Sequence, residues 1–124
     1  MTSEPTNVKI TLSLQPEGES EQIFSERGVL LSQKEKALVK MDKRRFQIEK
    51  DRVLIFQGYT IELRKDRETK LDYPTPYGTL SMSVKTKKLD ISADLMTVTA
   101  KYSLCSAGQR IHDIEMKLKT ETEK

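Results

Sequence analysis

The chain has 124 residues, of which 33% are charged and 35% hydrophobic, and its formal net charge is +3. This length fits one domain and excludes a second core, while the small net charge means that any basic surface must come from local clustering. Nucleic-acid binding is therefore neither demanded nor excluded, and no stretch approaches the roughly 18 consecutive apolar residues of a membrane span.

The cellular compartment is suggested by two further features. Residues 1–5 lack the basic segment followed by an apolar segment that marks a secretory signal. The single cysteine, Cys105, has no partner for an internal disulfide, in agreement with a reducing compartment. We therefore expect a cytoplasmic protein without a membrane partner.

The domain is expected to cover residues 7–119, between flexible polar tails at residues 1–6 and 120–124. Its first predicted strand has alternate apolar residues that share one face, namely Val8, Ile10, Leu12 and Leu14. The pattern then predicts an extended segment over residues 22–33 with a bend at Gly28.

The next segment predicts a hairpin. Ala37, Val39 and Met41 alternate with polar or outward positions, and the polar stretch 42–44 forms a turn into an apolar pair, Phe46 and Ile48. A helix over residues 32–41 is the alternative, although no helix stop signal follows it. After a turn at residues 49–52, every second position points to the same face on both sides of Gly58 and is mostly apolar. This pattern predicts one bent strand or two strands joined at the glycine.

The motif Tyr73-Pro74-Thr75-Pro76-Tyr77-Gly78-Thr79 predicts a rigid turn that leads into a long, half-buried strand. Its prolines fix φ near −65° and hold the preceding residues extended, while Gly78 permits a conformation closed to other residues. The apolar phase of the strand changes between Val84 and Leu89. An extra residue near Thr86-Lys87-Lys88 must therefore be absorbed by a β-bulge, which bends a sheet sharply.

The last predicted strands cover residues 96–104 and 114–118, with a turn at residues 92–94 before them and a hairpin turn at Ala107-Gly108 between them. Many one-sided strands joined by short turns, without crossover helices, predict an all-β antiparallel meander. An up-and-down closed barrel of about eight or more strands is the favoured architecture, because closure removes exposed sheet edges.

Three segments resemble the YwiB-like family of bacterial proteins: the residue 73–79 motif, Thr86-Lys87-Lys88-Leu89, and Ala100-Lys101-Tyr102-Ser103-Leu104. The resemblance spans roughly residues 8–119 and implies a calycin-like (lipocalin-like) β-barrel with no established activity. The chain departs from the family pattern at Phe56-Gln57-Gly58, where relatives tend to have an arginine before the glycine.

Catalytic and metal chemistry has little support in the sequence. One histidine and one cysteine are too few for a clustered metal site, and no cofactor is expected. His112 shares the apolar phase of the last strand, as a strand-end histidine with a local hydrogen bond or as a proton-transfer group. Cys105 lies opposite the apolar phase and is expected to be an inert thiol. An enzyme hypothesis rests only on His112 with a nearby tyrosine or Asp113.

Several polar side chains occupy the alternating positions that are predicted to face the core. Buried polar groups must pair with one another, hold water or meet a ligand, and a small barrel has room for one small molecule. Tyrosine adds apolar area and one hydroxyl, a mixture typical of binding pockets. The alternative is that these residues lie at the barrel rims, where water satisfies them. The candidate ligand-binding residues are Gln57, Tyr59, Tyr73, Tyr77, Thr86, Tyr102 and His112.

We therefore predict a non-catalytic barrel that binds a small, partly apolar ligand at its mouth, with Tyr73 and Tyr77 as a lip. The alternative is an accessory factor that binds RNA or an acidic protein through two basic clusters, Lys40-Lys43-Arg44-Arg45 and Lys85-Lys87-Lys88. Solvation alone also explains lysines at such turns. Outward patches would equally serve a homodimer, since alternation does not distinguish a solvated face from an interface.

Overall fold

The computed structural model describes residues 5–107 and 109–122, which form strands and turns and contain no helix that could span a membrane. The strands, in chain order, are β1 (Thr6–Pro16), β2 (Gln22–Ser32), β3 (Lys36–Lys40), β4 (Arg45–Glu49), β5 (Arg52–Phe56), β6 (Thr60–Arg64), β7 (Glu68–Thr75), β8 (Gly78–Ile91), β9 (Thr97–Ser106) and β10 (Gln109–Thr122). They form one sheet in the order β6-β5-β4-β3-β2-β1-β10-β9-β8-β7. Every neighbouring pair is antiparallel, so the predicted all-β antiparallel barrel is confirmed.

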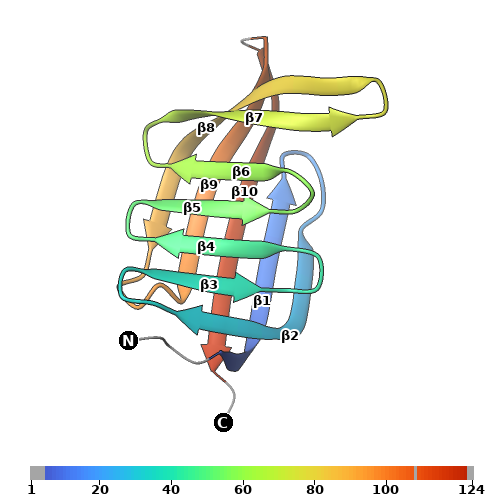
Figure 1. The fold of residues 1–124 in the computed structure, drawn as a ribbon. Helices are drawn as coiled ribbons and strands as arrows, with labels where there is room; N and C mark the ends of the chain where they lie inside the picture. Colours follow the sequence, from blue (N-terminus) through green and yellow to red (C-terminus); the bar gives the residue numbers. More distant parts are fainter. Residues whose placement is uncertain (1–4, 108, 123–124) are drawn as a thin grey trace.

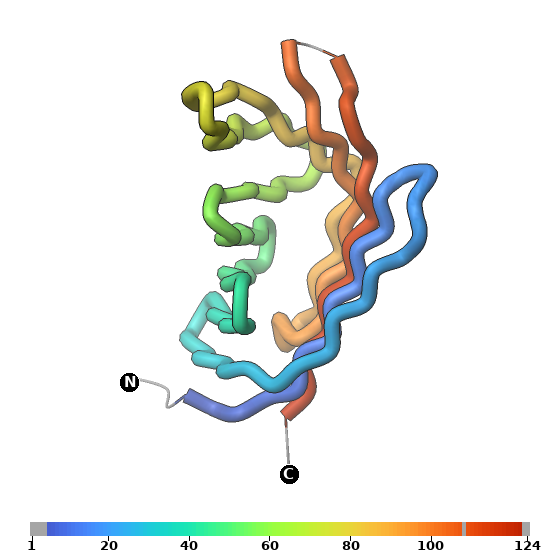
Figure 2. Tube along the Cα trace, turned by 90° about the vertical axis from the view of Figure 1, so that its right-hand side faces the viewer, coloured from blue at the N-terminus to red at the C-terminus, as the bar shows by residue number. Residues whose placement is uncertain are grey.

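The sheet curls so that two groups of strands face each other across the core. The short strands β3 to β6 run across the long strands β1, β9 and β10 (Figure 1), and the side view separates the two layers (Figure 2). In strands such as β3, β4, β5 and β6, alternate residues are buried between the layers. The largest fully buried side chains include Phe46, Ile10, Leu12, Ile48, Ile61 and Leu63.

Two strands turn the corners between the layers. β2 pairs with β1 over most of its length and begins to pair with β3 at Val29, directly after Gly28. A side chain at Gly28 would collide with Ile10 Cδ1 and with the backbone carbonyl oxygen of Lys40, so only glycine fits this approach. In β8 the register shifts between Thr86 and Lys88, which confirms the predicted bulge.

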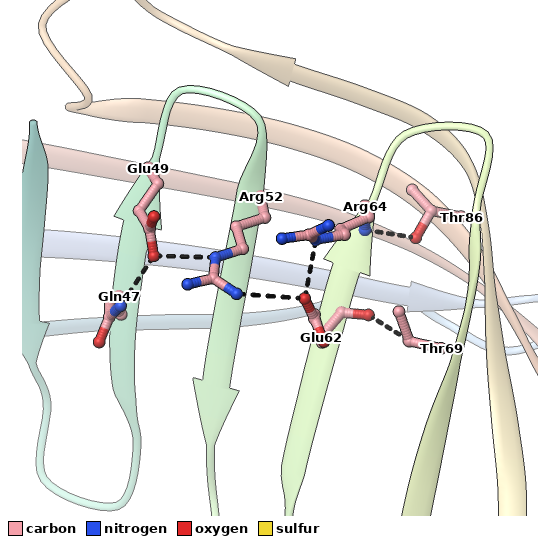
Figure 3. Close-up of polar contacts among 7 residues, drawn as sticks. All are labelled: Gln47, Glu49, Arg52, Glu62, Arg64, Thr69 and Thr86. Carbon is pink, nitrogen blue, oxygen red and sulfur yellow. Dashed lines mark hydrogen bonds and ion pairs between the residues drawn. The ribbon is translucent and has the colours of Figure 1, made fainter.

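The barrel is nearly closed where the two ends of the sheet, β6 and β7, come together. The Thr69 hydroxyl donates to the Glu62 carbonyl oxygen at 2.6 Å, and the Arg64 amide donates to Thr86 Oγ1 at 3.2 Å (Figure 3). Side-chain hydroxyls therefore bridge this seam in place of a regular strand ladder.

Beside the seam, a row of charged side chains runs across β4, β5 and β6. Arg52 contacts Glu49 at 3.0 Å and Glu62 at 3.4 Å, and Arg64 Nε lies 2.9 Å from the same Glu62 carboxylate (Figure 3). Cross-strand pairs of opposite charge stabilise neighbouring strands modestly.

The predicted hairpin is present as β3 and β4, so the helical alternative for residues 32–41 is wrong. Of the two possibilities for the run through Gly58, two strands joined by a turn is the correct one, and Gly58 has a φ of 88° there. Strand β7 was missed, because Leu71 is its one buried side chain and gives no alternation to detect. The motif at residues 73–79 is consequently a hairpin that ends β7 and begins β8, and Pro74 is tolerated on that edge strand.

The paired strands also reach into segments assigned to the terminal tails. β1 begins at Thr6, and β10 continues to Thr122, which pairs with Val8. Of the predicted hairpin turn at residues 107 and 108, Ala107 has a φ of 50° and Gly108 lies outside the described residues.

Candidate functional site

A cavity of about 200 Å³ lies inside one end of the barrel. Most of its wall is core side chains from both layers, among them Leu12, Phe46, Ile61 and Met116. The β3–β4 and β5–β6 turns lie on the same side of the molecule, beside the β1–β2 hairpin (Figure 1). The mouth of the cavity is therefore formed by turns, and its floor by the packed core.

Polar side chains gather on the two turns at this mouth. In the β5–β6 turn the backbone N–H of Gln57 donates to the backbone carbonyl oxygen of Tyr59 at 3.0 Å, across Gly58. The side chains of Gln57 and Tyr59 therefore lie on the same side of the turn. Gln57 Nε2 donates to the Tyr59 hydroxyl at 2.9 Å, and Arg44 Nε donates to Gln57 Oε1 at 2.9 Å. The resulting Arg44–Gln57–Tyr59 chain joins the β3–β4 turn to the β5–β6 turn.

The guanidinium of Arg44 is held in place without a counter-ion. Its central carbon lies over the Phe24 ring, 4.8 Å from the centroid, where the ring attracts the cation. Within the described part of the chain, its polar contact is Gln57 and no carboxylate lies within ion-pair distance. Its two terminal nitrogens are therefore available to an acceptor from outside the chain.

Tyr102, on β9, is 4% exposed and lines the same cavity. Its hydroxyl makes no hydrogen bond with any of the described residues. Burial raises the pKa of Tyr102, and the neighbouring Tyr59 raises it further, against a smaller opposing effect of Arg44. The phenol therefore keeps its proton at neutral pH, and it can donate that proton to an acceptor in the cavity.

The two tyrosines of the residue 73–79 motif have different places. The ring of Tyr73 packs edge-on against Tyr59, with centroids 4.9 Å apart and an interplanar angle of 62°. Tyr73 therefore supports the mouth through Tyr59. Tyr77 is fully exposed at the tip of the β7–β8 hairpin and contacts none of these residues.

Thr86 and His112 lie away from the cavity. Thr86 is buried as its phase predicts, but its hydroxyl accepts from the Arg64 amide at the seam of the barrel, where it has a structural partner. His112 Nε2 lies 3.2 Å from the Glu19 carboxylate, which belongs to the β1–β2 turn. This is the local contact of a strand-end histidine.

Cys105 and Asp113 lie outside this cavity. Cys105 is buried as a free thiol, and nowhere in residues 5–107 and 109–122 do three acidic, histidine or cysteine side chains group as metal ligands would. Asp113 accepts from Ser103 Oγ and contacts Arg110 and Lys87. The hydrogen bond from Ser103 lowers the pKa of Asp113, with a smaller contribution from the two cations.

One of the two basic clusters is partly neutralised. Lys87 lies 3.5 Å from Asp113, and Lys88 lies 3.6 Å from Asp90. In the other cluster, Arg45 lies over the Phe56 ring on the outside of the barrel, while Arg44 turns toward the cavity.

Arg44 is the functional candidate that sequence reasoning missed, because it was assigned to a surface cluster. The sequence did contain an indication, because Arg44 lies two residues before Phe46 and four before Ile48 and so points to the same face of the strand as these buried side chains. The polar turn before it hid that phase, since a basic residue in a turn is usually solvated.

Comparisons with known proteins agree with this architecture. The model of a family described as "Domain of unknown function (DUF1934)" matches residues 8–118. Among solved structures, the chain is similar to the crystal structure of the ywiB protein from Bacillus subtilis, with a TM-score of 0.77 and 14% identity over 99% of this chain and 96% of that one. At this identity the likeness shows the fold. No match was found among curated proteins.

Proposed function

The chain belongs to the DUF1934 family, in agreement with its resemblance to YwiB-like proteins, and we propose that it is a non-catalytic barrel that binds a small, partly apolar ligand in the cavity at its mouth. One observation carries the proposal. Tyr102 is 4% exposed and lines an apolar cavity, and its hydroxyl has no hydrogen-bond partner among the described residues. A ligand with a hydrogen-bond acceptor would give this hydroxyl a partner inside the cavity.

The composition of the wall supports a ligand of mixed polarity. Core side chains form most of the cavity, and its polar groups belong to Gln22, Arg44, Gln57, Tyr59 and Tyr102. Ligand pockets typically combine an apolar lining with a few placed polar groups that orient the ligand. A purely structural cavity would not need polar groups on facing elements.

The alternative through the basic clusters has weaker support. Lys87 and Lys88 each contact a carboxylate, which reduces the positive field that an RNA or an acidic partner would meet. The free thiol of Cys105 suits a reducing compartment, so the proposal places the protein in the cytoplasm.

Native mass spectrometry of protein purified from its own host tests the proposal. We expect a retained small molecule that is lost from a variant in which the cavity is filled, Leu104→Trp, because Leu104 lines it. Thr97→Trp, at an exposed position of the same strand, is the matched control and should retain the ligand. A clean unliganded mass, together with no uptake of an apolar fluorescent dye by the unmodified protein, would contradict the proposal.

A further inference from the structure

We propose that the ligand is a short-chain amphiphile with an anionic oxygen-acid head group, which Arg44 and Tyr102 hold at the mouth while the apolar chain occupies the cavity. This inference rests on the proposed function and specifies the chemistry of its ligand. It follows from the charge of the cavity, from the way Arg44 is held, and from the cavity's size.

The charge of the site is positive, and no carboxylate of the described residues pairs with it. Arg44 is the one charged side chain among the described residues that line the cavity. On the barrel surface, by contrast, Arg52, Arg64 and Arg110 each contact a carboxylate. A cation beside an apolar wall attracts an anion more strongly than one in open solvent, because the local dielectric constant is lower. A cationic ligand is disfavoured for the same reason.

Arg44 is also oriented before any ligand arrives. Gln57 accepts from Nε, and the central carbon of the guanidinium lies over the Phe24 ring, so two contacts restrain its position. Both terminal nitrogens then present the paired donors that match two oxygens of a carboxylate or phosphate. Gln57 is itself held by the Tyr59 hydroxyl, which limits the freedom that binding would have to remove.

Tyr102 provides a further donor in the cavity. The residue is 4% exposed, and its protonated hydroxyl has no partner among the described residues. It lines the same cavity as Arg44, from the facing layer of the barrel. A head-group oxygen between them would satisfy both groups, whereas an apolar ligand alone would leave both unsatisfied.

The volume limits the apolar chain. About 200 Å³ corresponds to about seven water molecules at liquid density. Pockets for drug-sized ligands are larger, about 300–1,000 Å³. A chain of about eight carbons with a head group at the mouth is therefore the appropriate scale, and a long-chain lipid is not.

Calorimetric titration with octanoate, 1-octanol and octylamine tests the inference on protein freed of bound ligand. We expect octanoate to bind about tenfold or more tightly than octanol, since a charge-assisted hydrogen bond is worth about that factor. Octylamine should bind most weakly. Octyl phosphate, added as a fourth ligand, distinguishes a phosphate from a carboxylate head group.

Variants then assign the effect to residues. Arg44→Gln should remove the preference for octanoate over octanol, and Tyr102→Phe should weaken octanoate severalfold with little effect on octanol. Arg45→Gln is the matched control, because it removes the same charge from the neighbouring position on the outside of the barrel. It should leave both affinities unchanged.

The outcomes separate this inference from the proposed function. Equal binding of octanol and octanoate, unaffected by Arg44→Gln, would overturn the inference and leave an apolar pocket in place. Absence of binding by any of the ligands would overturn both. If Arg44→Gln fails to fold, the preference of the unmodified protein for octanoate over octanol still decides the question.

Discussion

Removing the hydroxyl group is predicted to destabilise the protein at Tyr59 and not to destabilise it at Tyr102, although both tyrosines line the cavity. Tyr59→Phe should destabilise the unliganded protein, because Gln57 Nε2 loses the acceptor that it meets at 2.9 Å. Tyr102→Phe should not destabilise it, because the Tyr102 hydroxyl has no partner to lose within the described residues. The pair thereby tests the observation on which the proposed function rests.

The magnitudes follow from the two environments. One net hydrogen bond contributes about 0.5–1.5 kcal/mol, and Gln57 is half-buried, so water replaces part of the loss. We expect Tyr59→Phe to cost about 1 kcal/mol. Tyr102→Phe removes a hydroxyl that makes no hydrogen bond with the described residues, so a change between about 0 and a gain of about 1 kcal/mol is expected.

Urea unfolding followed by circular dichroism measures both changes. With a slope of about 2 kcal/mol per molar urea, 1 kcal/mol displaces the midpoint by about 0.5 M. The slope itself should be unchanged, since neither substitution alters the surface exposed on unfolding. The reasoning is refuted if Tyr102→Phe is destabilised as much as Tyr59→Phe, because the Tyr102 hydroxyl would then have a partner in the unliganded protein.

Two further substitutions test the fold. Gly28→Ala should lower the free energy of unfolding by about 1–3 kcal/mol, because the added methyl group collides with Ile10 Cδ1 and the Lys40 carbonyl oxygen. Adding Ile10→Val removes Cδ1 and should recover part of this loss in urea unfolding. If the effects of the two substitutions are strictly additive, the steric explanation is wrong. Asp113→Asn should make stability less sensitive to acid. The hydrogen bond from Ser103 lowers the pKa of Asp113 on folding, so the Asp113 carboxylate stabilises the fold at neutral pH and this contribution is lost as the pH falls below about 4. If both proteins are equally sensitive to acid, the hydrogen bond between Ser103 and Asp113 does not contribute in this way.

Properties local to one strand could be predicted from the sequence. Alternation assigns each side chain to a face of its own strand, whatever the neighbouring strands are, so the inward phase of Gln57, Tyr59 and Tyr102 was recognisable. The bulge beside Lys87 was equally visible, because a change of phase within one strand requires an extra residue there. Strand β7 has too few apolar residues to show an alternating pattern, so the sequence does not predict it.

Properties that depend on how the sheet closes were decided by the tertiary structure alone. Phase places Thr86 inside the barrel, but only the meeting of β6 with β7 and β8 gives its hydroxyl the Arg64 amide as a partner. Likewise, only the curl of the sheet brings the β3–β4 turn beside the β5–β6 turn, so that Arg44 reaches Gln57. The sequence by itself determined the faces of the strands, because the period of two is a property of the backbone. The contacts of the mouth are between residues far apart in the chain, and closure of the barrel brings them together.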